Sequence, residues 1–160
     1  MTINIGEKIP SVTLQYMDGS SIKNESTDEL FSGKKVALFA LPGAFTPTCS
    51  ATHLPGYVVK SDALFDKGID LIVCLSVNDA FVMSAWGKQH NTEDRVMMLA
   101  DGSANFTQAV GLELDLTSNG MGVRSQRYSM LINDGVIEGL NIEAPGKFEV
   151  SDADTMLSNL

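Results

Sequence analysis

The chain contains two apolar runs of strand length, which predict strands that are buried on both faces. Residues 35–41 read KVALFAL and residues 70–77 read DLIVCLSV, with few polar positions in either. Continuous runs of this kind are typical of central strands in a sheet that helices cover on both sides. Between them, residues 47–67 predict a long helical segment that ends at Gly68. We therefore expect a strand, a helix and a parallel strand in succession.

Turn and cap signals predict the elements before these runs. Residues 12–17 alternate apolar and polar side chains and end at an Asp-Gly pair, which is a hairpin signal. The next stretch predicts a short helix, because Ser26 and Glu29 have the spacing of a capping box and Gly33 follows as a stop signal.

The carboxyl half predicts further helices and one clear hairpin. Asp79 is the expected N-cap of a helix that includes AFVMSAWGKQ. After it we expect a strand at 95–100, a helix at 103–110 that Gly111 stops, and a polar loop at 117–122. The segments RYSMLIN and VIEGLNIE flank Asp134-Gly135 and predict a β-hairpin. A final helix follows, with Ser151 as its expected cap.

This order of elements predicts a three-layer α/β/α sandwich with a thioredoxin-like core and an amino-terminal hairpin extension. The early strands should pair in parallel and the late ones antiparallel. The sequence has no internal repeat and no linker of low complexity, so we expect one domain over residues 1–160.

Composition and charge argue against several classes of function. The 160 residues are 44% hydrophobic and 19% charged, as in a soluble globular protein. A net charge of −9 argues against a nucleic-acid partner, since non-specific binding to phosphates depends on Lys and Arg. No apolar run approaches the roughly 20 residues of a membrane span, and the amino end lacks a secretory signal pattern. We therefore expect a cytoplasmic protein that does not contact a membrane. Two cysteines, two histidines and no CxxC motif argue against a disulfide framework and a structural zinc site.

The sequence TPTC at residues 46–49 has the pattern of a helix start that favours a thiolate. Thr46 is the expected N-cap, with its hydroxyl accepting from a backbone N–H, and Pro47 suits the first helical position. Cys49 then lies in the first turn, where free N–H groups and the helix dipole favour an anion and lower the pKa of a thiol. These residues alone leave two interpretations about equally open, a reactive cysteine and a packed apolar one.

A thiolate by itself does not make a fast enzyme. Lowering a thiol pKa from about 8.5 to about 6 raises the thiolate fraction at pH 7 about thirty-fold, but the accompanying loss of nucleophilicity removes about ten-fold. Most of the rate must therefore come from groups that stabilise the transition state, and the candidates are Thr46 and an arginine.

The second cysteine and the nearest histidine receive less weight. Cys74 lies inside the run LIVCLSV, where burial raises the thiol pKa and makes the thiol inert, so we favour a structural role over a resolving one. His53 follows Cys49 by four residues and could share its helix face. A Cys–His nucleophile pair is one interpretation, but a surface or packing histidine is the commoner case. Pro55 is expected to bend this helix.

Several motifs together carry a resemblance to a known family. The stretch PGAFTPTC has the form P-x-x-x-T-x-x-C and resembles the peroxidatic-cysteine motif of peroxiredoxins. LPGAFTPTCSATHLPGY, SVNDAFVMSAW, LADGSANFTQAVGLELDL and RSQRYSML resemble the type II (class 5-like) peroxiredoxins, and the resemblance covers essentially the whole chain. It implies a thiol peroxidase for hydrogen peroxide and organic hydroperoxides, with no metal and no bound cofactor.

The resemblance also implies roles for single residues. Cys49 is similar to the peroxidatic cysteine, which attacks the peroxide and becomes a sulfenic acid. Thr46 would hydrogen-bond the thiolate and the peroxide, and Pro42 would shield the pocket from water. Arg127 matches the family's arginine, which orients the cysteine and polarises the O–O bond. Arg124 is a second candidate cation, on which we place less weight.

The reductant and the assembly stay open at this point. Some members of this group form an internal disulfide with a cysteine near the position of Cys74, and others rely on glutathione with glutaredoxin or on thioredoxin. We favour the one-cysteine route, and the resemblance implies a homodimer. An alternative function is a peroxide-sensing relay or holdase that uses the same cysteine with little turnover. A cysteine hydrolase is least favoured, because no base with an orienting partner is evident.

Overall fold

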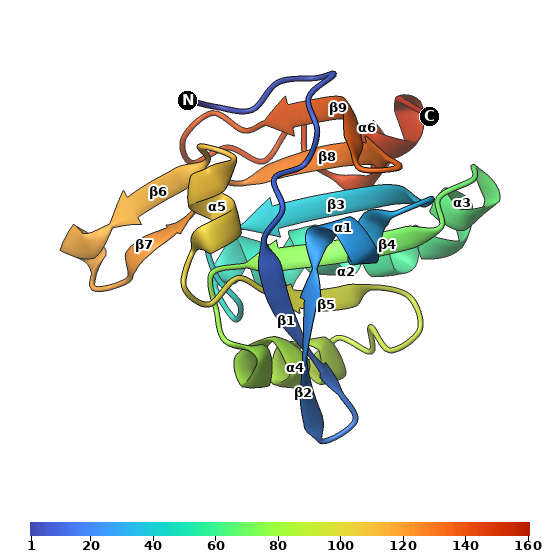
Figure 1. Ribbon diagram of the computed structural model, residues 1–160. Helices are drawn as coiled ribbons and strands as arrows, with labels where there is room; N and C mark the ends of the chain where they lie inside the picture. Colours follow the sequence, from blue (N-terminus) through green and yellow to red (C-terminus); the bar gives the residue numbers. More distant parts are fainter.

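A mixed sheet of seven strands forms the middle layer of the computed structural model, which describes residues 1–160 (Figure 1). Its strand order is β2-β1-β5-β4-β3-β8-β9, and a separate pair contains β6 and β7. The strands are β1 Thr13–Asp18, β2 Ser21–Ser26, β3 Lys35–Leu41, β4 Leu71–Ser76, β5 Met97–Ala100, β6 Glu113–Leu116, β7 Gly122–Ser125, β8 Tyr128–Asn133 and β9 Val136–Ile142.

Strand directions follow the predicted division of the chain. Strand β3 pairs in parallel with β4, and β4 pairs in parallel with β5. Strand β8 then runs antiparallel to β3, and β9 antiparallel to β8. The predicted three-layer, thioredoxin-like fold with a hairpin of β1 and β2 at its amino end is confirmed.

The two faces of β3 show why its sequence is apolar at every position after Lys35. Ala37, Phe39 and Leu41 contribute to one core cluster. Val36, Leu38 and Ala40 contribute to the other cluster. Alternate residues of a strand point to opposite faces, so a central strand that supplies two cores needs an unbroken apolar run.

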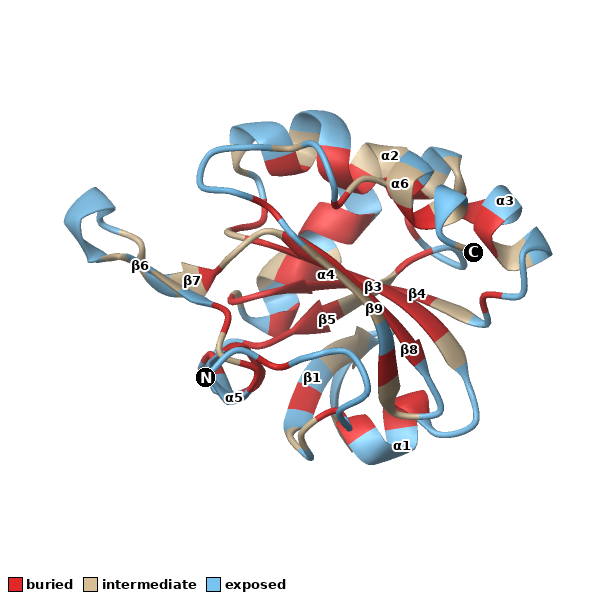
Figure 2. Cartoon of the chain, turned by 90° about the horizontal axis from the view of Figure 1, so that it is seen from above, coloured by how far each residue is buried: buried red, intermediate tan, exposed pale blue.

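Helices cover both faces of the sheet (Figure 2). One face packs against Leu54, Leu64, Met83 and Met156 of the helices α2, α3, α4 and α6. The other packs against Leu30, Phe31 and Phe106 of α1 and α5. The helices are α1 Thr27–Phe31, α2 Leu54–Val59, α3 Ser61–Asp66, α4 Ala80–Gln89, α5 Asn105–Ala109 and α6 Ala153–Ser158. None of them is long and apolar enough to cross a membrane.

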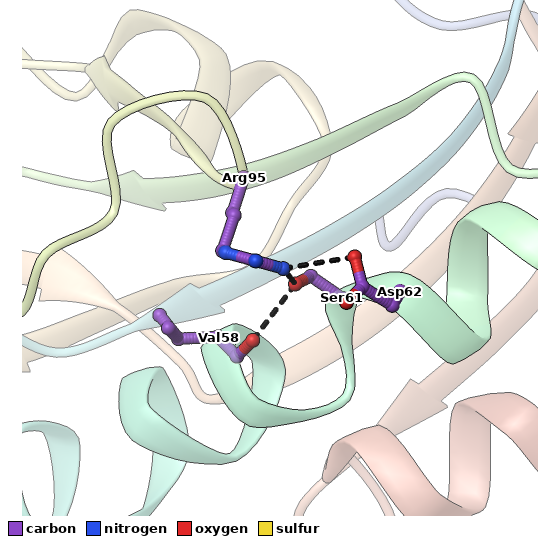
Figure 3. Close-up of polar contacts among 4 residues, drawn as sticks. All are labelled: Val58, Ser61, Asp62 and Arg95. Carbon is purple, nitrogen blue, oxygen red and sulfur yellow. Dashed lines mark hydrogen bonds and ion pairs between the residues drawn. The ribbon is translucent and has the colours of Figure 1, made fainter.

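The helical segment after β3 differs from the single helix that the sequence predicts. It begins at Pro47 and contains a π-helical turn at Cys49–His53 before α2. It is interrupted again between α2 and α3, where Ser61 Oγ donates to the Val58 carbonyl at 2.8 Å (Figure 3). Arg95, two residues before β5, holds this break in place, because its Nη1 donates to the same Ser61 hydroxyl and to Asp62 Oδ1, at 2.8 and 2.9 Å.

Cap predictions are confirmed at two helices and wrong at a third. Ser26 accepts from the Glu29 N–H at the start of α1, and Asp79 accepts from Val82 at the start of α4. The last helix is capped by Asp152, whose side chain accepts from the Thr155 N–H. Ser151 was the expected cap, but its hydroxyl donates to Glu143 at 2.7 Å and is therefore not available to the helix.

One hairpin of the carboxyl half was predicted and a second was not. Asp134 and Gly135 both have positive φ, 49° and 80°, as the tight turn between β8 and β9 requires. The predicted polar loop at 117–122 is confirmed, but it connects β6 and β7, a second hairpin that the sequence did not predict. This hairpin projects away from the body of the protein (Figure 1).

Candidate active site

Cys49 lies in the first turn of the helical segment that follows β3. The Ser50 N–H donates to the Thr46 carbonyl at 2.9 Å, which makes Thr46 the N-cap residue and Pro47 the first residue of the helix. The predicted place of Cys49, near the free N–H groups of the helix start, is therefore confirmed. Its side chain is fully buried, with no exposed fraction.

The turn that begins at Cys49 is wider than an α-helical turn. The Leu54 N–H donates to the Cys49 carbonyl, five residues back, which is the π-helical pattern. Pro55 follows directly and has no N–H to donate, so the helix cannot carry its regular ladder through this point. Single π turns of this kind occur frequently at functional sites. The sequence predicted a bend at Pro55, and the structure has a π turn immediately before it.

Arg127 brings a cation to the thiol from a distant part of the chain. It precedes β8, and the register of β8 against β3 pairs Tyr128 with Ala40, close to the end of β3 from which the Cys49 loop departs. Arg127 Nη2 donates to Cys49 Sγ at 3.1 Å. The structure therefore brings together the two residues to which the family resemblance assigns a shared role.

His53 is the third member of this group, although its sequence position favoured a surface or packing role. It is 1% exposed, so it is not a surface residue. Its Nδ1 lies 2.7 Å from Arg127 Nη1, and its Nε2 lies 3.1 Å from the Ser151 carbonyl. Because a carbonyl only accepts and a guanidinium only donates, Nε2 carries the proton and Nδ1 accepts. Burial and the positive charge of Arg127 lower the pKa of His53 to about 3, so the ring is neutral near pH 7.

The loop before the helix places Thr46 differently from the prediction. The Thr46 hydroxyl donates to the Gly43 carbonyl at 2.6 Å, where the sequence predicted that it would accept from a helix N–H. Its oxygen lone pairs remain free to accept from another donor. Pro42, at the end of β3, is half-buried, and its carbonyl accepts from Arg124 Nη1 at 3.2 Å. Phe45 completes the loop with a φ of 66°, a strained value for a bulky residue.

Arg124 binds the backbone of this loop and not the thiol. Its Nε donates to the Met121 carbonyl at 2.9 Å, while Nη1 binds the Pro42 carbonyl. Gly43 allows the approach, because a Cβ built on it would lie 2.8 Å from Arg124 Nη1. The structure thus brings Arg127 to Cys49 and Arg124 to the backbone of the Pro42 loop.

Cys74 lies in the core beneath the site. It is fully buried on β4, in register with Phe39 of β3. Burial, together with the charge of Cys49, raises the pKa of Cys74 well above that of a free thiol. Both cysteines are free thiols in this structure.

A hollow elsewhere on the protein does not include these site residues. This hollow, of about 960 Å³, is lined by Met17 of β1, Phe81 of α4 and Met98 of β5, with Arg95 also at its wall. Cys49 and Arg127 do not line it. No group of three or more His, Cys, Asp or Glu side chains is arranged to hold a metal ion.

A thioredoxin-like sheet with a buried cysteine at a helix start, paired with arginine, defines the class of thiol-based redox proteins. Within that class, the model of the Redoxin family matches residues 4–157. The chain is 51% identical over 163 residues to the chloroplastic Peroxiredoxin-2E of Arabidopsis thaliana, covering 99% of this chain and 70% of that protein. It is 46% identical over 159 residues to Peroxiredoxin-2B of the same plant, covering 99% of this chain and 98% of that one.

A solved structure agrees with these relatives. Reduced Prx3 from Vibrio vulnificus, in complex with H₂O₂, superposes with a TM-score of 0.95 at 53% identity, covering 99% of each chain. The chain therefore belongs to the Redoxin family and is a peroxiredoxin, an oxidoreductase with peroxidase activity. Peroxiredoxins need no prosthetic group.

Proposed function

We propose that Cys49 is the peroxidatic nucleophile of a thiol peroxidase that reduces hydrogen peroxide and organic hydroperoxides. The observation that carries this proposal is the 3.1 Å contact between Arg127 Nη2 and the sulfur of a cysteine in the first turn of a helix. An arginine stays charged at any working pH, so a cationic hydrogen-bond donor always faces this sulfur. The Vibrio vulnificus relative with H₂O₂ bound supports the choice of substrate.

The proposed reaction transfers two electrons from sulfur to the peroxide. The Cys49 thiolate attacks the terminal oxygen of HO–OR, the S–O bond forms and the O–O bond breaks. The leaving RO⁻ takes up one proton and departs as an alcohol, or as water when the substrate is hydrogen peroxide. Cys49 is left as a sulfenic acid. The guanidinium of Arg127 stabilises the charge that passes from sulfur to the leaving oxygen.

Three neighbouring residues shape the pocket in this proposal. The Thr46 hydroxyl donates a hydrogen bond to the Gly43 carbonyl, which orients its oxygen to accept from the peroxide O–H. Pro42 excludes water above the thiol. Arg124 acts on the reaction through the loop, because it binds the Pro42 carbonyl. In this proposal Thr46 contacts the peroxide, whereas Arg124 only holds the backbone of the loop in place.

Reduction of the sulfenic acid proceeds, in our proposal, with Cys74 as a spectator. A resolving cysteine must reach the oxidised sulfur as a thiolate, and Cys74 is fully buried in a central strand with a raised pKa. An external thiol then resolves the sulfenic acid, supplied by glutathione with glutaredoxin or by thioredoxin. Two reductant thiols give one disulfide and one water and return Cys49 to its starting state.

We also propose a homodimer through the end of the sheet that carries the site. Strands β3 and β4 are parallel neighbours, so the loops after them leave at the same edge. These loops lead to Phe45 and Phe81, which are 49% and 61% exposed. Large exposed aromatic rings at one edge are typical of protein interfaces. Analytical ultracentrifugation of Phe81→Asp tests this, with dissociation to monomer expected.

The experiment that tests the activity compares the two cysteines. Cys49→Ser is expected to abolish peroxide consumption with glutathione and glutaredoxin or with thioredoxin, whereas Cys74→Ser keeps most of it. Mass spectrometry of peroxide-treated protein should find sulfenic acid or a glutathione adduct on Cys49. Near-complete activity of Cys49→Ser would overturn the assignment, and a disulfide between Cys49 and Cys74 would overturn the one-cysteine route.

A further inference from the structure

Four residues behind the thiol form a closed ring of hydrogen bonds. Arg127 Nη1 donates to His53 Nδ1, and His53 Nε2 donates to the Ser151 carbonyl. The Ser151 N–H and hydroxyl donate to the Glu143 carboxylate at 2.8 and 2.7 Å. The ring closes where the Glu143 N–H donates to the Arg127 carbonyl at 3.0 Å. The same arginine that touches Cys49 is therefore held at both its backbone and its guanidinium.

Hydrogen bonds and aromatic contacts fix the orientation of the His53 imidazole. Both ring nitrogens are bonded, and the imidazole packs against Phe39 and Phe148, with ring centroids 4.9 and 4.8 Å away. The Tyr57 hydroxyl donates to the Ser151 carbonyl at 2.9 Å, beside the bond from His53. Neither nitrogen is available to take a proton from Cys49, so the Cys–His nucleophile pair does not fit this geometry.

Glu143 fixes the carbonyl to which His53 binds. The residue is 7% exposed, and its carboxylate accepts from the N–H groups of Glu149, Val150 and Ser151. It thereby ties residues 149–151 to β9's end and sets the direction of the Ser151 carbonyl. Hydrogen bonds to an ionised group are shorter and stronger than neutral ones, so this segment forms a rigid back wall.

The planar guanidinium of Arg127 couples the orientation of His53 to the contact with the Cys49 sulfur. Its nitrogens lie in one plane, so fixing Nη1 on His53 also fixes the direction of Nη2, which meets Cys49 Sγ. The Phe148 ring lies 5.7 Å from the guanidinium carbon and supports the group from one side. Without an acceptor at Nη1, the plane could rotate away from the thiol.

We propose that His53 is the positioning residue of Arg127, presenting an unprotonated Nδ1 that holds the guanidinium in line with Cys49 and the incoming peroxide. This inference rests on the proposed function of Cys49 and Arg127. It makes His53 a determinant of the oxidation step although the imidazole bonds to neither the sulfur nor the substrate. Glu143 and Ser151 support it by holding the other nitrogen.

The kinetic test compares two replacements of nearly equal size. His53→Asn retains an amide oxygen close to the place of Nδ1, whereas His53→Leu retains only the shape. We expect His53→Leu to lower the second-order rate constant of Cys49 oxidation by up to about 100-fold, as a small misplacement of a catalytic group does, and His53→Asn to recover at least about ten-fold of that loss. Equal rates for the two variants, or a wild-type rate for His53→Leu, would overturn the proposal.

A spectroscopic test reads the protonation of His53 in protein that keeps this residue. Nitrogen NMR should show His53 with its proton on Nε2, and separate, slowly exchanging Nη signals for Arg127. The chain has two histidines, so His90→Gln assigns the imidazole signals. A proton on Nδ1 of His53 would overturn the proposal even if the enzyme is a peroxidase. If Cys49→Ser remains active while the NMR result is as expected, the proposed function fails and the geometric role of His53 survives.

Discussion

Arg127 Nη2 lies 3.1 Å from Cys49 Sγ, although 78 positions separate the two residues in the sequence. The contact depends on the fork of the guanidinium, because Nη1 is bonded to His53 at the same time. A lysine would keep the charge but could not hold both partners. We expect Arg127→Lys to reduce the rate of Cys49 oxidation by about 100-fold or more.

The chain provides a reporter and a control for this measurement. Its single tryptophan, Trp86, donates from Nε1 to Ser50 Oγ at 2.9 Å, and Ser50 follows Cys49 directly, so stopped-flow fluorescence should follow oxidation of Cys49. Arg95→Lys makes the same replacement at the break between α2 and α3 and should leave the rate close to that of the wild type. Similar losses in both variants would show that the effect is not specific to the site.

Gly43 should be sensitive to the addition of a single methyl group. A Cβ at this position would lie 2.8 Å from Arg124 Nη1 and 3.2 Å from Thr46 Cγ2, so the loop over the thiol must shift. We expect Gly43→Ala to lower the peroxidase rate by about 10-fold or more through misplacement of Thr46. Gly56→Ala is the matched control: it meets open space in α2 and should raise the free energy of unfolding by about 0.5–1 kcal/mol.

Cys74 should be slow to react with alkylating agents under native conditions. Its raised pKa and complete burial leave little thiolate at pH 7–8, the form that iodoacetamide attacks. Peptide mapping should find no modified Cys74 in the native protein and full modification after unfolding in urea. Cys74→Ala is expected to cost about 1–2 kcal/mol of stability, from the small cavity that it leaves, and to keep the peroxidase activity. Rapid native alkylation of Cys74 would contradict the one-cysteine route.

The neutral state of His53 predicts a loss of stability in acid. Its pKa is about 3 in the folded protein and about 6.5 when unfolded, so below pH 6.5 the unfolded state takes up a proton that the folded state does not. The contribution is complete above pH 6.5 and falls by up to about 1.4 kcal/mol per pH unit toward pH 3. Arg127, Glu143 and Tyr57 are the titratable groups that face the imidazole. Urea unfolding of His53→Asn at pH 4–7 should show a flatter dependence than the wild type.

Glu143 should act in the same direction but at lower pH. Burial by itself would raise the pKa of its carboxyl, but the N–H groups of residues 149–151 and the Ser151 hydroxyl outweigh burial and lower the pKa overall. Its stabilising contribution is therefore complete above the ordinary pKa of glutamate and is lost as the pH falls through the lower folded value.

The corresponding replacement is Glu143→Gln, with Glu149→Gln as an exposed control one turn of loop away. At pH 7 we expect Glu143→Gln to lower the free energy of unfolding by about 2 kcal/mol or more, because an amide cannot accept from all the donors of this segment. The control should change it by less than about 0.5 kcal/mol. Loss of stability in the control alone would refute the role of Glu143.

The fold could be read from the sequence because its signals are local. The unbroken apolar run of β3 reflects burial on both faces, and Asp134-Gly135 supplies the two positive φ values that a tight hairpin needs. Cys49 and Arg127 were found through the family motif that contains them. The place of Cys49 in the first helical turn also follows from the capping preferences of its neighbours.

What the sequence could not show depends on long-range contacts. The partner of His53 is a main-chain carbonyl 98 residues away, and a carbonyl has no residue type that a motif could record. This carbonyl belongs to Ser151. The sequence predicts that the Ser151 hydroxyl caps α6, but in the structure this hydroxyl donates to Glu143. The strands β6 and β7 have four residues each and only Ser125 among them is buried, so no long apolar run marks this hairpin in the sequence. The i, i+4 spacing of Cys49 and His53 was the one available signal.

The π turn has a consequence for what happens after the thiol is oxidised. Cys49 and His53 stand at its two ends, and Pro55 just beyond gives the turn no further N–H to hold it. If this turn unwinds so that a reductant can reach the sulfur, the sulfenic acid and the acceptor of Arg127 leave together. The contacts that we propose to activate peroxide would then be lost in the motion that exposes the oxidised sulfur. Further oxidation to the irreversible sulfinic acid would be confined to the closed form, so the lifetime of that form sets how much peroxide the protein survives.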